Sequence, residues 1–176
     1  MTPEQILDQL DASRERLLVA IEPLPDEALQ AAGVMDDWSI ADILSHLIAW
    51  ESELVTALLR IDQGRPPATM LAAIGDVDGY NARRFAESKG RPLARIFDDL
   101  QGVRVQLESW LDRFSERELR RPLRLPWTEG ITLSLDDMIR ENSYGHELEH
   151  LPDIEAFAGR WLAEHGEAPA EEGAVR

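Results

Sequence analysis

Apolar residues recur at the spacing of an α-helix in four long stretches of this chain, and Pro or Gly residues separate the stretches. The predicted helices run from Pro3 to Pro23, from Ser39 to Gly64, from Pro92 to Leu111 and from Ser134 to Leu162. Three of them begin with a hydroxyl residue followed three positions later by an acid or an amide, a helix-capping pattern: Thr2 and Gln5, Ser39 and Asp42, and Ser134 and Asp137. Four amphipathic helices without an alternating strand pattern predict an all-α fold, a four-helix bundle.

Shorter accessory elements are expected between these helices. They are a helical turn within 26–33, a loop over 64–75 with a helical piece around Met70, a helix over 76–88 and a connecting loop over 121–134 with a short extended piece. Pro152 cannot donate a hydrogen bond to the Leu148 carbonyl. We therefore expect the last helix to kink or break just after His150.

The chain has 176 residues, which is enough for one domain with a single core. We expect the bundle to occupy residues 1–163 and a mobile, disordered acidic tail to occupy 164–176, where the apolar periodicity ends. No apolar stretch approaches the roughly 20 residues of a membrane span, so no membrane partner is expected. The N-terminus lacks a basic region followed by an apolar block, so the expected location is cytoplasmic.

The charge balance excludes one class of partner. The chain carries 18 Lys and Arg residues against 34 Asp and Glu residues, a net charge of -16. Such a chain repels phosphate backbones, so no nucleic-acid partner is expected. One run of arginines is interleaved with acidic residues and is typical of a solvated face: Arg113, Arg117, Arg120, Arg121 and Arg124.

Four histidines and no cysteines limit how this chain can bind a metal ion. Without thiolates, the ligands must be His, Asp or Glu. His146 and His150 are four residues apart, so on a helix they project from one face, and that face is the apolar stripe. His46 lies at the edge of the apolar face of the second long helix, whereas His165 lies in the expected tail. His46, His146 and His150 are therefore candidates for a common site.

Two interpretations of these three histidines remain open at this point. A single inward histidine is more often a hydrogen-bonded core residue than a metal ligand. Three buried rings, however, need partners for their nitrogens, and each polar group left without one costs on the order of 1 to 3 kcal/mol. A divalent cation bound by three His nitrogens satisfies the rings together and leaves open positions, as catalytic metal sites do.

Two segments resemble signatures of a known family. Residues 36–53, DDWSIADILSHLIAWESE, resemble the second-helix signature of the DinB-like (YfiT-like) superfamily. Residues 141–157, ENSYGHELEHLPDIEAF, resemble its last-helix motif with two histidines four apart. Within the superfamily, residues 142–150 and 80–100 are most similar to the ClbS/DfsB-like group.

The resemblance implies a four-helix bundle in which a histidine triad holds a divalent metal ion, zinc or nickel. Matched to this sequence, the metal ligands are His46, His146 and His150. Members of the superfamily include thiol-dependent transferases and isomerases, whereas ClbS-type members protect cells from reactive cyclopropane-bearing compounds.

These implications lead to one functional hypothesis and two alternatives. We expect a metal-dependent hydrolase or thiol-dependent S-transferase that acts on a reactive small molecule. Glu53, two turns beyond His46, is the candidate proton carrier, and Trp50 and Tyr144 are candidate walls of the substrate pocket, although such rings also fit ordinary core packing. The alternatives are a ClbS-like resistance protein that sequesters a small molecule without turnover, and a non-catalytic bundle that forms a homodimer.

Overall fold

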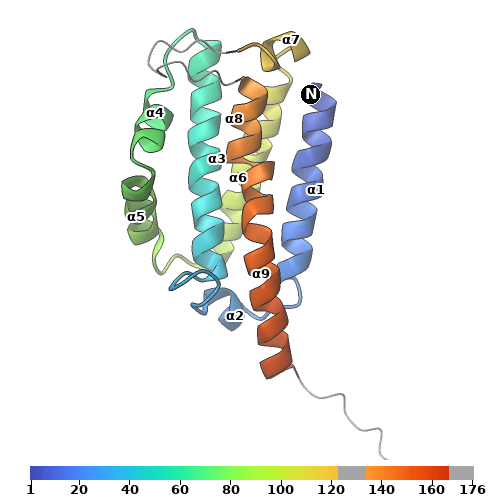
Figure 1. Cartoon of the computed structure of the whole chain (residues 1–176), viewed down its shortest axis with the longest axis vertical. Coiled ribbons are helices and arrows are strands. Elements are labelled where there is room, and N and C mark those ends of the chain that lie inside the picture. The colour runs from blue at the N-terminus through green and yellow to red at the C-terminus, as the bar shows by residue number, and fades with distance from the viewer. Residues whose placement is uncertain (123–133, 167–176) are drawn as a thin grey trace, which may run out of the picture.

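The computed structural model describes residues 1–122 and 134–166 and shows a bundle of four long helices (Figure 1). In chain order these are α1 (Pro3–Ile21), α3 (Ile40–Asp62), α6 (Leu93–Leu111) and α9 (Tyr144–His165). Helices α3 and α6 run in one direction along the long axis, and α1 and α9 run in the other (Figure 1). Helix α3 packs mainly against α6, and α1 packs mainly against α9. The predicted all-α bundle is confirmed, and no strand occurs among the described residues.

All three predicted helix starts are present as complete capping boxes. The hydroxyl of Ser39, for example, accepts a hydrogen bond from the Asp42 amide at 3.1 Å, and the Asp42 carboxylate accepts one from the Ser39 amide at 2.9 Å. The same reciprocal pair occurs at Thr2 and at Ser134. These bonds satisfy backbone donors that have no partner inside the helix, so the boundaries follow directly from local sequence.

Shorter helices complete the described part of the chain: α2 (Asp26–Gln30), α4 (Ala68–Gly75), α5 (Val77–Ser88), α7 (Glu116–Leu119) and α8 (Leu135–Asn142). Helices α2, α4 and α5 lie where short helices were predicted. Helix α7 was not predicted, although Ser115 and Glu118 form a capping box at its start. Helices α4 and α5 lie along the outer side of α3 (Figure 1).

The break in the last predicted helix lies before the metal-ligand candidates, not after His150. Helices α8 and α9 are separated at Ser143, whose backbone leaves the helical region at φ -140 and ψ -105. The Ser143 hydroxyl donates to the Ile139 carbonyl at 2.5 Å. It thus competes with backbone N–H groups for this carbonyl oxygen. Helix α9 continues without interruption through Pro152. The reason is that Leu151 and Ile154, on either side of the proline, are buried in the core, and this packing holds the helix together.

Two further sequence predictions fall mainly where the structure is not described. The expected connecting loop includes 123–133, which lies outside the described residues, so its predicted extended piece is not seen. Helix α9 continues to His165, and the remainder of the predicted tail, 167–176, also lies outside the described residues.

Among the described residues, the two large apolar clusters of the core have a layer of charged side chains between them, and a small third cluster lies where α4 and α5 pack on α3. The first, here called the Leu17 cluster, includes Leu17, Ile43, Leu47, Leu100, Ile154 and Phe157. The second, the Leu107 cluster, includes Ile6, Leu10, Leu54, Leu107, Ile139 and Tyr144. Along each long helix, a buried polar residue lies between the residues of the Leu17 cluster and those of the Leu107 cluster. We call the set of Ser13, Arg14, Glu51, Arg104 and Glu147 the charged layer.

Within residues 1–122 and 134–166, none of the helices combines the length and the hydropathy that a membrane span needs.

Candidate metal centre

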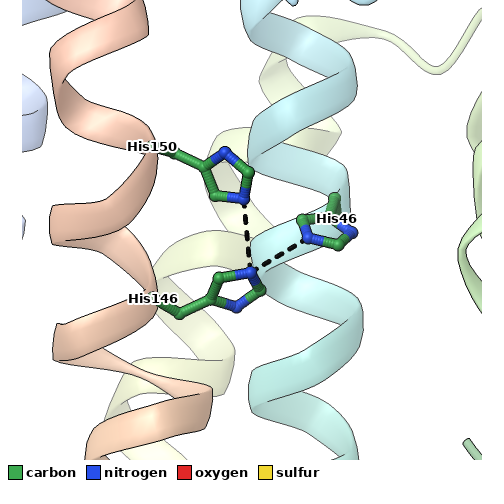
Figure 2. A group of neighbouring side chains, drawn as sticks. All are labelled: His46, His146 and His150. Carbon is green, nitrogen blue, oxygen red and sulfur yellow. Dashed lines mark hydrogen bonds between the residues drawn. The ribbon is translucent and has the colours of Figure 1, made fainter. Parts of the chain in front are cut away.

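Three imidazoles from two antiparallel helices meet beside the charged layer. His46 extends from α3, and His146 and His150 extend from successive turns of α9 (Figure 2). The Nε2 atom of His146 lies 3.0 Å from Nε2 of His46 and 3.2 Å from Nε2 of His150. One nitrogen from each ring lies within 4.8 Å of the others. The three candidate ligands that the sequence predicted are therefore brought together.

These separations suit a single bound ion. Zinc to imidazole nitrogen distances of 2.0 to 2.1 Å and a tetrahedral angle place ligand nitrogens about 3.3 to 3.4 Å apart. The two separations of 3.0 and 3.2 Å are close to this value. The third pair of nitrogens, from His46 and His150, lies within 4.8 Å, so these two rings would move closer together to direct three lone pairs onto one centre.

Hydrogen bonding alone satisfies the three rings poorly. A neutral imidazole nitrogen carries either one hydrogen or one lone pair, so Nε2 of His146 can make one good bond but faces two Nε2 atoms. A cation between the rings would accept a lone pair from each and remove this competition. Nδ1 of His146 is buried and has no hydrogen-bond partner among the described residues, so helix placement and packing orient this ring.

The surroundings keep the rings neutral, as metal ligands must be. Burial, with a smaller contribution from the adjacent His150, lowers the pKa of His46 from 6.5 to about 4. Burial and the two neighbouring imidazoles lower the pKa of His146 to about 3. The pKa of His150 is also lowered by burial. At neutral pH each ring therefore keeps a free lone pair for a metal ion.

A tight turn before α3 forms one side of the centre. Met35 and Trp38 pair across this turn, and Asp36 between them has a left-handed φ of 49. The Met35 sulfur lies 3.3 Å from Nδ1 of His150, and the Trp38 ring meets His46 edge-on with 5.4 Å between centroids. Phe85 stacks on the other side of Trp38 at 5.0 Å. The turn therefore contacts candidate ligands from both helices.

The structure places the predicted proton carrier away from the imidazoles. The Glu53 carboxylate accepts hydrogen bonds from the Tyr80 hydroxyl and from Nη2 of Arg84, both at 3.3 Å. Glu53 lies seven positions beyond His46, which is about 10.5 Å along a helix axis. Glu53 thus lies at the contact between α3 and α5, and its catalytic role stays a prediction.

The two predicted pocket aromatics lie in packed positions. The Trp50 indole donates to Oδ1 of Asn81 at 3.0 Å and its ring packs on Tyr80. Tyr144 belongs to the Leu107 cluster. Their roles as pocket walls also stay predictions.

Sequence reasoning did not assign Met35, Trp38 or Phe85 to the site. The available signal was the position of Trp38 eight residues before His46, but the turn that brings Met35 and Trp38 back onto the two helices depends on a left-handed residue that the sequence does not reveal.

The fold and the three-histidine cluster define a helical-bundle protein with a candidate metal centre. The model of the DinB superfamily matches residues 9–154, which include all three histidines. The chain therefore belongs to the DinB superfamily.

Solved structures share this fold at low sequence identity. An uncharacterised protein from Escherichia coli UTI89 is similar with a TM-score of 0.71 at 16% identity, over 90% of this chain and 94% of that one. A protein from Streptococcus pneumoniae is similar with a TM-score of 0.72 at 14% identity, over 93% of this chain and 91% of that one. Among curated proteins, none matches the chain in sequence.

Proposed function

We propose that this protein is a divalent-metal-dependent enzyme in which His46, His146 and His150 hold zinc or nickel. The observation that carries the proposal is the convergence of the three Nε2 atoms at 3.0 and 3.2 Å around the ring of His146. Membership of the DinB superfamily supports it. All three donors are neutral nitrogens, which suit both zinc and nickel.

The reaction that this centre suits best is hydrolysis or thiol transfer on a reactive small molecule. When bound, a divalent ion with three neutral ligands keeps its full positive charge and polarises a substrate oxygen or sulfur. The chain contributes neutral imidazoles and a partly apolar wall formed by Met35 and Trp38.

Glu53, Trp50 and Tyr144 retain their predicted roles within this proposal. The Glu53 carboxylate would carry a proton, with the Tyr80 hydroxyl as its neighbour. Trp50 and Tyr144 would border the substrate pocket. We further propose a cytoplasmic location and a homodimer for the assembled protein.

A second candidate function is sequestration of a reactive small molecule without turnover. It is favoured by the similarity of residues 142–150 and 80–100 to the ClbS/DfsB-like group. The same metal centre would then bind the compound rather than transform it.

The test compares turnover of reactive electrophiles by zinc-loaded, nickel-loaded and chelator-treated protein, with and without an added thiol. We expect turnover that disappears on chelation and in His146→Ala. His165→Ala, which removes an exposed imidazole in the last turn of α9, is the matched control and should retain activity. Turnover that survives both chelation and His146→Ala would reject the proposal. Stoichiometric binding of the compound without any turnover would favour sequestration instead.

A further inference from the structure

The charged layer connects all four long helices at the level of the metal centre. Arg14 comes from α1, Glu51 from α3, Arg104 from α6 and Glu147 from α9, and each is at most 9% exposed. Two positive and two negative side chains are thus buried together in an otherwise apolar core.

Each arginine of the layer contacts both glutamates. Nη2 of Arg14 lies 3.1 Å from Glu51 and 2.6 Å from Glu147. Arg104 donates through Nε to Glu51 at 2.7 Å and through Nη2 to Glu147 at 2.9 Å. Glu51 on α3 and Glu147 on α9 are therefore held by the same two cations.

The arginines are themselves fixed to the backbones of the other two helices. Nη1 of Arg14, on α1, donates to the Leu100 carbonyl of α6 at 2.9 Å, and Nη1 of Arg104, on α6, donates to the Leu10 carbonyl of α1 at 2.6 Å. Ser13 adds a hydrogen bond to Glu147 at 2.5 Å. Because these bonds are directional and buried, the two guanidinium groups have little freedom to follow a shift of α3 or α9.

The layer lies next to the metal ligands on both helices. Glu147 stands between His146 and His150 in α9, and Glu51 is five residues beyond His46 in α3. These two helices pack mainly against α6 and α1 rather than against each other. The buried Nδ1 of His146 has no partner among the described residues, so this ring follows the position of its helix.

A buried ion-pair network of this kind is weak evidence for added stability. The desolvation of four charges offsets most of their mutual attraction, and apolar replacements of similar size are often tolerated. Apolar side chains, in contrast, have no directional bonds that fix how far one helix is displaced along another. The layer is therefore the feature of the core best suited to fix the placement of α3 relative to α9.

We propose that Arg14, Glu51, Arg104 and Glu147 are positioning residues of the metal centre, which set the separation and axial register of α3 and α9 so that the three imidazoles share one ion. This inference rests on the proposed function, since it assigns the layer a role in metal binding.

The test uses variants that alter the network at constant net charge. Arg104→Lys keeps the positive charge but loses the planar fork that contacts two carboxylates. The double variant Glu51→Met with Arg104→Met removes one charge of each sign and fills the space. Leu119→Ala, in the buried core at α7, is the control because it lowers stability without touching the layer.

The first readout is the zinc dissociation constant of the folded protein, measured by competition with a chelator. We expect both network variants to bind zinc about 10- to 100-fold more weakly than the wild type, the range found when residues that orient ligands are replaced. Leu119→Ala should bind as the wild type does, even where its melting temperature is as low as that of the network variants. Wild-type affinity in the folded network variants would overturn the inference.

The second readout does not need the metal. The natural chain has no cysteine, so spin labels can be attached at Thr56→Cys on α3 and Glu155→Cys on α9, both exposed positions. In metal-free protein, we expect the distance distribution between the labels to shift or broaden in the double variant and to stay unchanged in Leu119→Ala. An unchanged distribution in the double variant would overturn the positioning role. Absence of both zinc and nickel binding by the wild type would instead reject the proposed function, while this distance still decides the role of the layer.

Discussion

At the scale of single residues, the candidate centre depends on imidazoles that stay neutral where free histidine would be charged. The pKa of His46 is lowered to about 4 and that of His146 to about 3, with burial as the main cause in both. Protonation of either ring would place a charge beside two other imidazoles in a poorly solvated site. Folding and metal binding therefore both favour the unprotonated rings.

This leads to a pH dependence of stability in the metal-free protein. Between pH 6.5 and about pH 4 the unfolded chain binds protons at these histidines and the folded chain does not, so stability falls as the pH falls. Each ring that stays neutral contributes a slope of about 1.4 kcal/mol per pH unit. Urea unfolding across this range, with chelator present, measures the slope.

A matched pair of variants separates the histidine contribution from that of the many carboxylates. His146→Leu should have a shallower slope than the wild type, and His165→Leu, at an exposed position, should keep the wild-type slope. Equal slopes in the wild type and His146→Leu would contradict the assigned burial of this ring.

The candidate ligand set was predictable from the sequence, and the residues around it were not. Four-residue spacing places His146 and His150 on one helix face regardless of tertiary structure, and the apolar neighbours of His46 direct it inward. The charged layer was missed because periodicity reports which face a residue occupies but not which charge it meets across the core. Arg14 and Glu147 are 133 positions apart in the chain.

At the scale of elements, the junction between α8 and α9 sets where the helix that carries the candidate ligands His146 and His150 begins. The chain breaks at Ser143, and Gly145 follows in the first turn of α9. A Cβ atom at Gly145 would lie 2.7 Å from the Arg140 carbonyl oxygen, closer than real Cβ contacts allow. The absence of a side chain at this position therefore permits the close approach of the two helices.

Two glycines of α9 should respond oppositely to the same substitution. Gly145→Ala should destabilise the protein by about 1 to 3 kcal/mol because backbone must move to relieve the contact. Gly159→Ala, where a Cβ would meet nothing within 4 Å, should stabilise it by about 0.4 to 1 kcal/mol. Chemical denaturation of both variants measures the difference. A stabilising Gly145→Ala would contradict the described junction.

The boundaries of the elements show which local signals are decisive. Capping boxes at Thr2, Ser39 and Ser134 fixed three helix starts because both partners lie within four residues. The position of the break was predicted wrongly, since Pro152 is a strong local signal and Ser143 a weak one. Tertiary burial of Leu151 and Ile154 outweighs the missing proline donor.

At the scale of the whole molecule, the bundle joins two apolar clusters through a charged layer and places the three-histidine centre beside that layer. An ion that binds only the folded arrangement must stabilise the whole bundle. At a free ion concentration of 100 times the dissociation constant, the gain in unfolding free energy is about 2.7 kcal/mol.

Thermal unfolding in a zinc or nickel titration should reveal this coupling. We expect the melting temperature of chelator-treated wild type to rise with ion concentration and that of His46→Ala to stay nearly constant. His165→Ala should follow the wild type. An equal rise in His46→Ala would indicate binding elsewhere on this acidic chain.

The most direct test of the account is the metal content of protein purified without an affinity tag, since a polyhistidine tag would supply other ligands. Elemental analysis should find close to one divalent ion, zinc or nickel, for each wild-type chain and almost none in His46→Ala or His146→Ala. Wild-type protein that neither retains nor takes up such an ion, or variants that hold as much as the wild type, would contradict the assignment of these histidines as metal ligands.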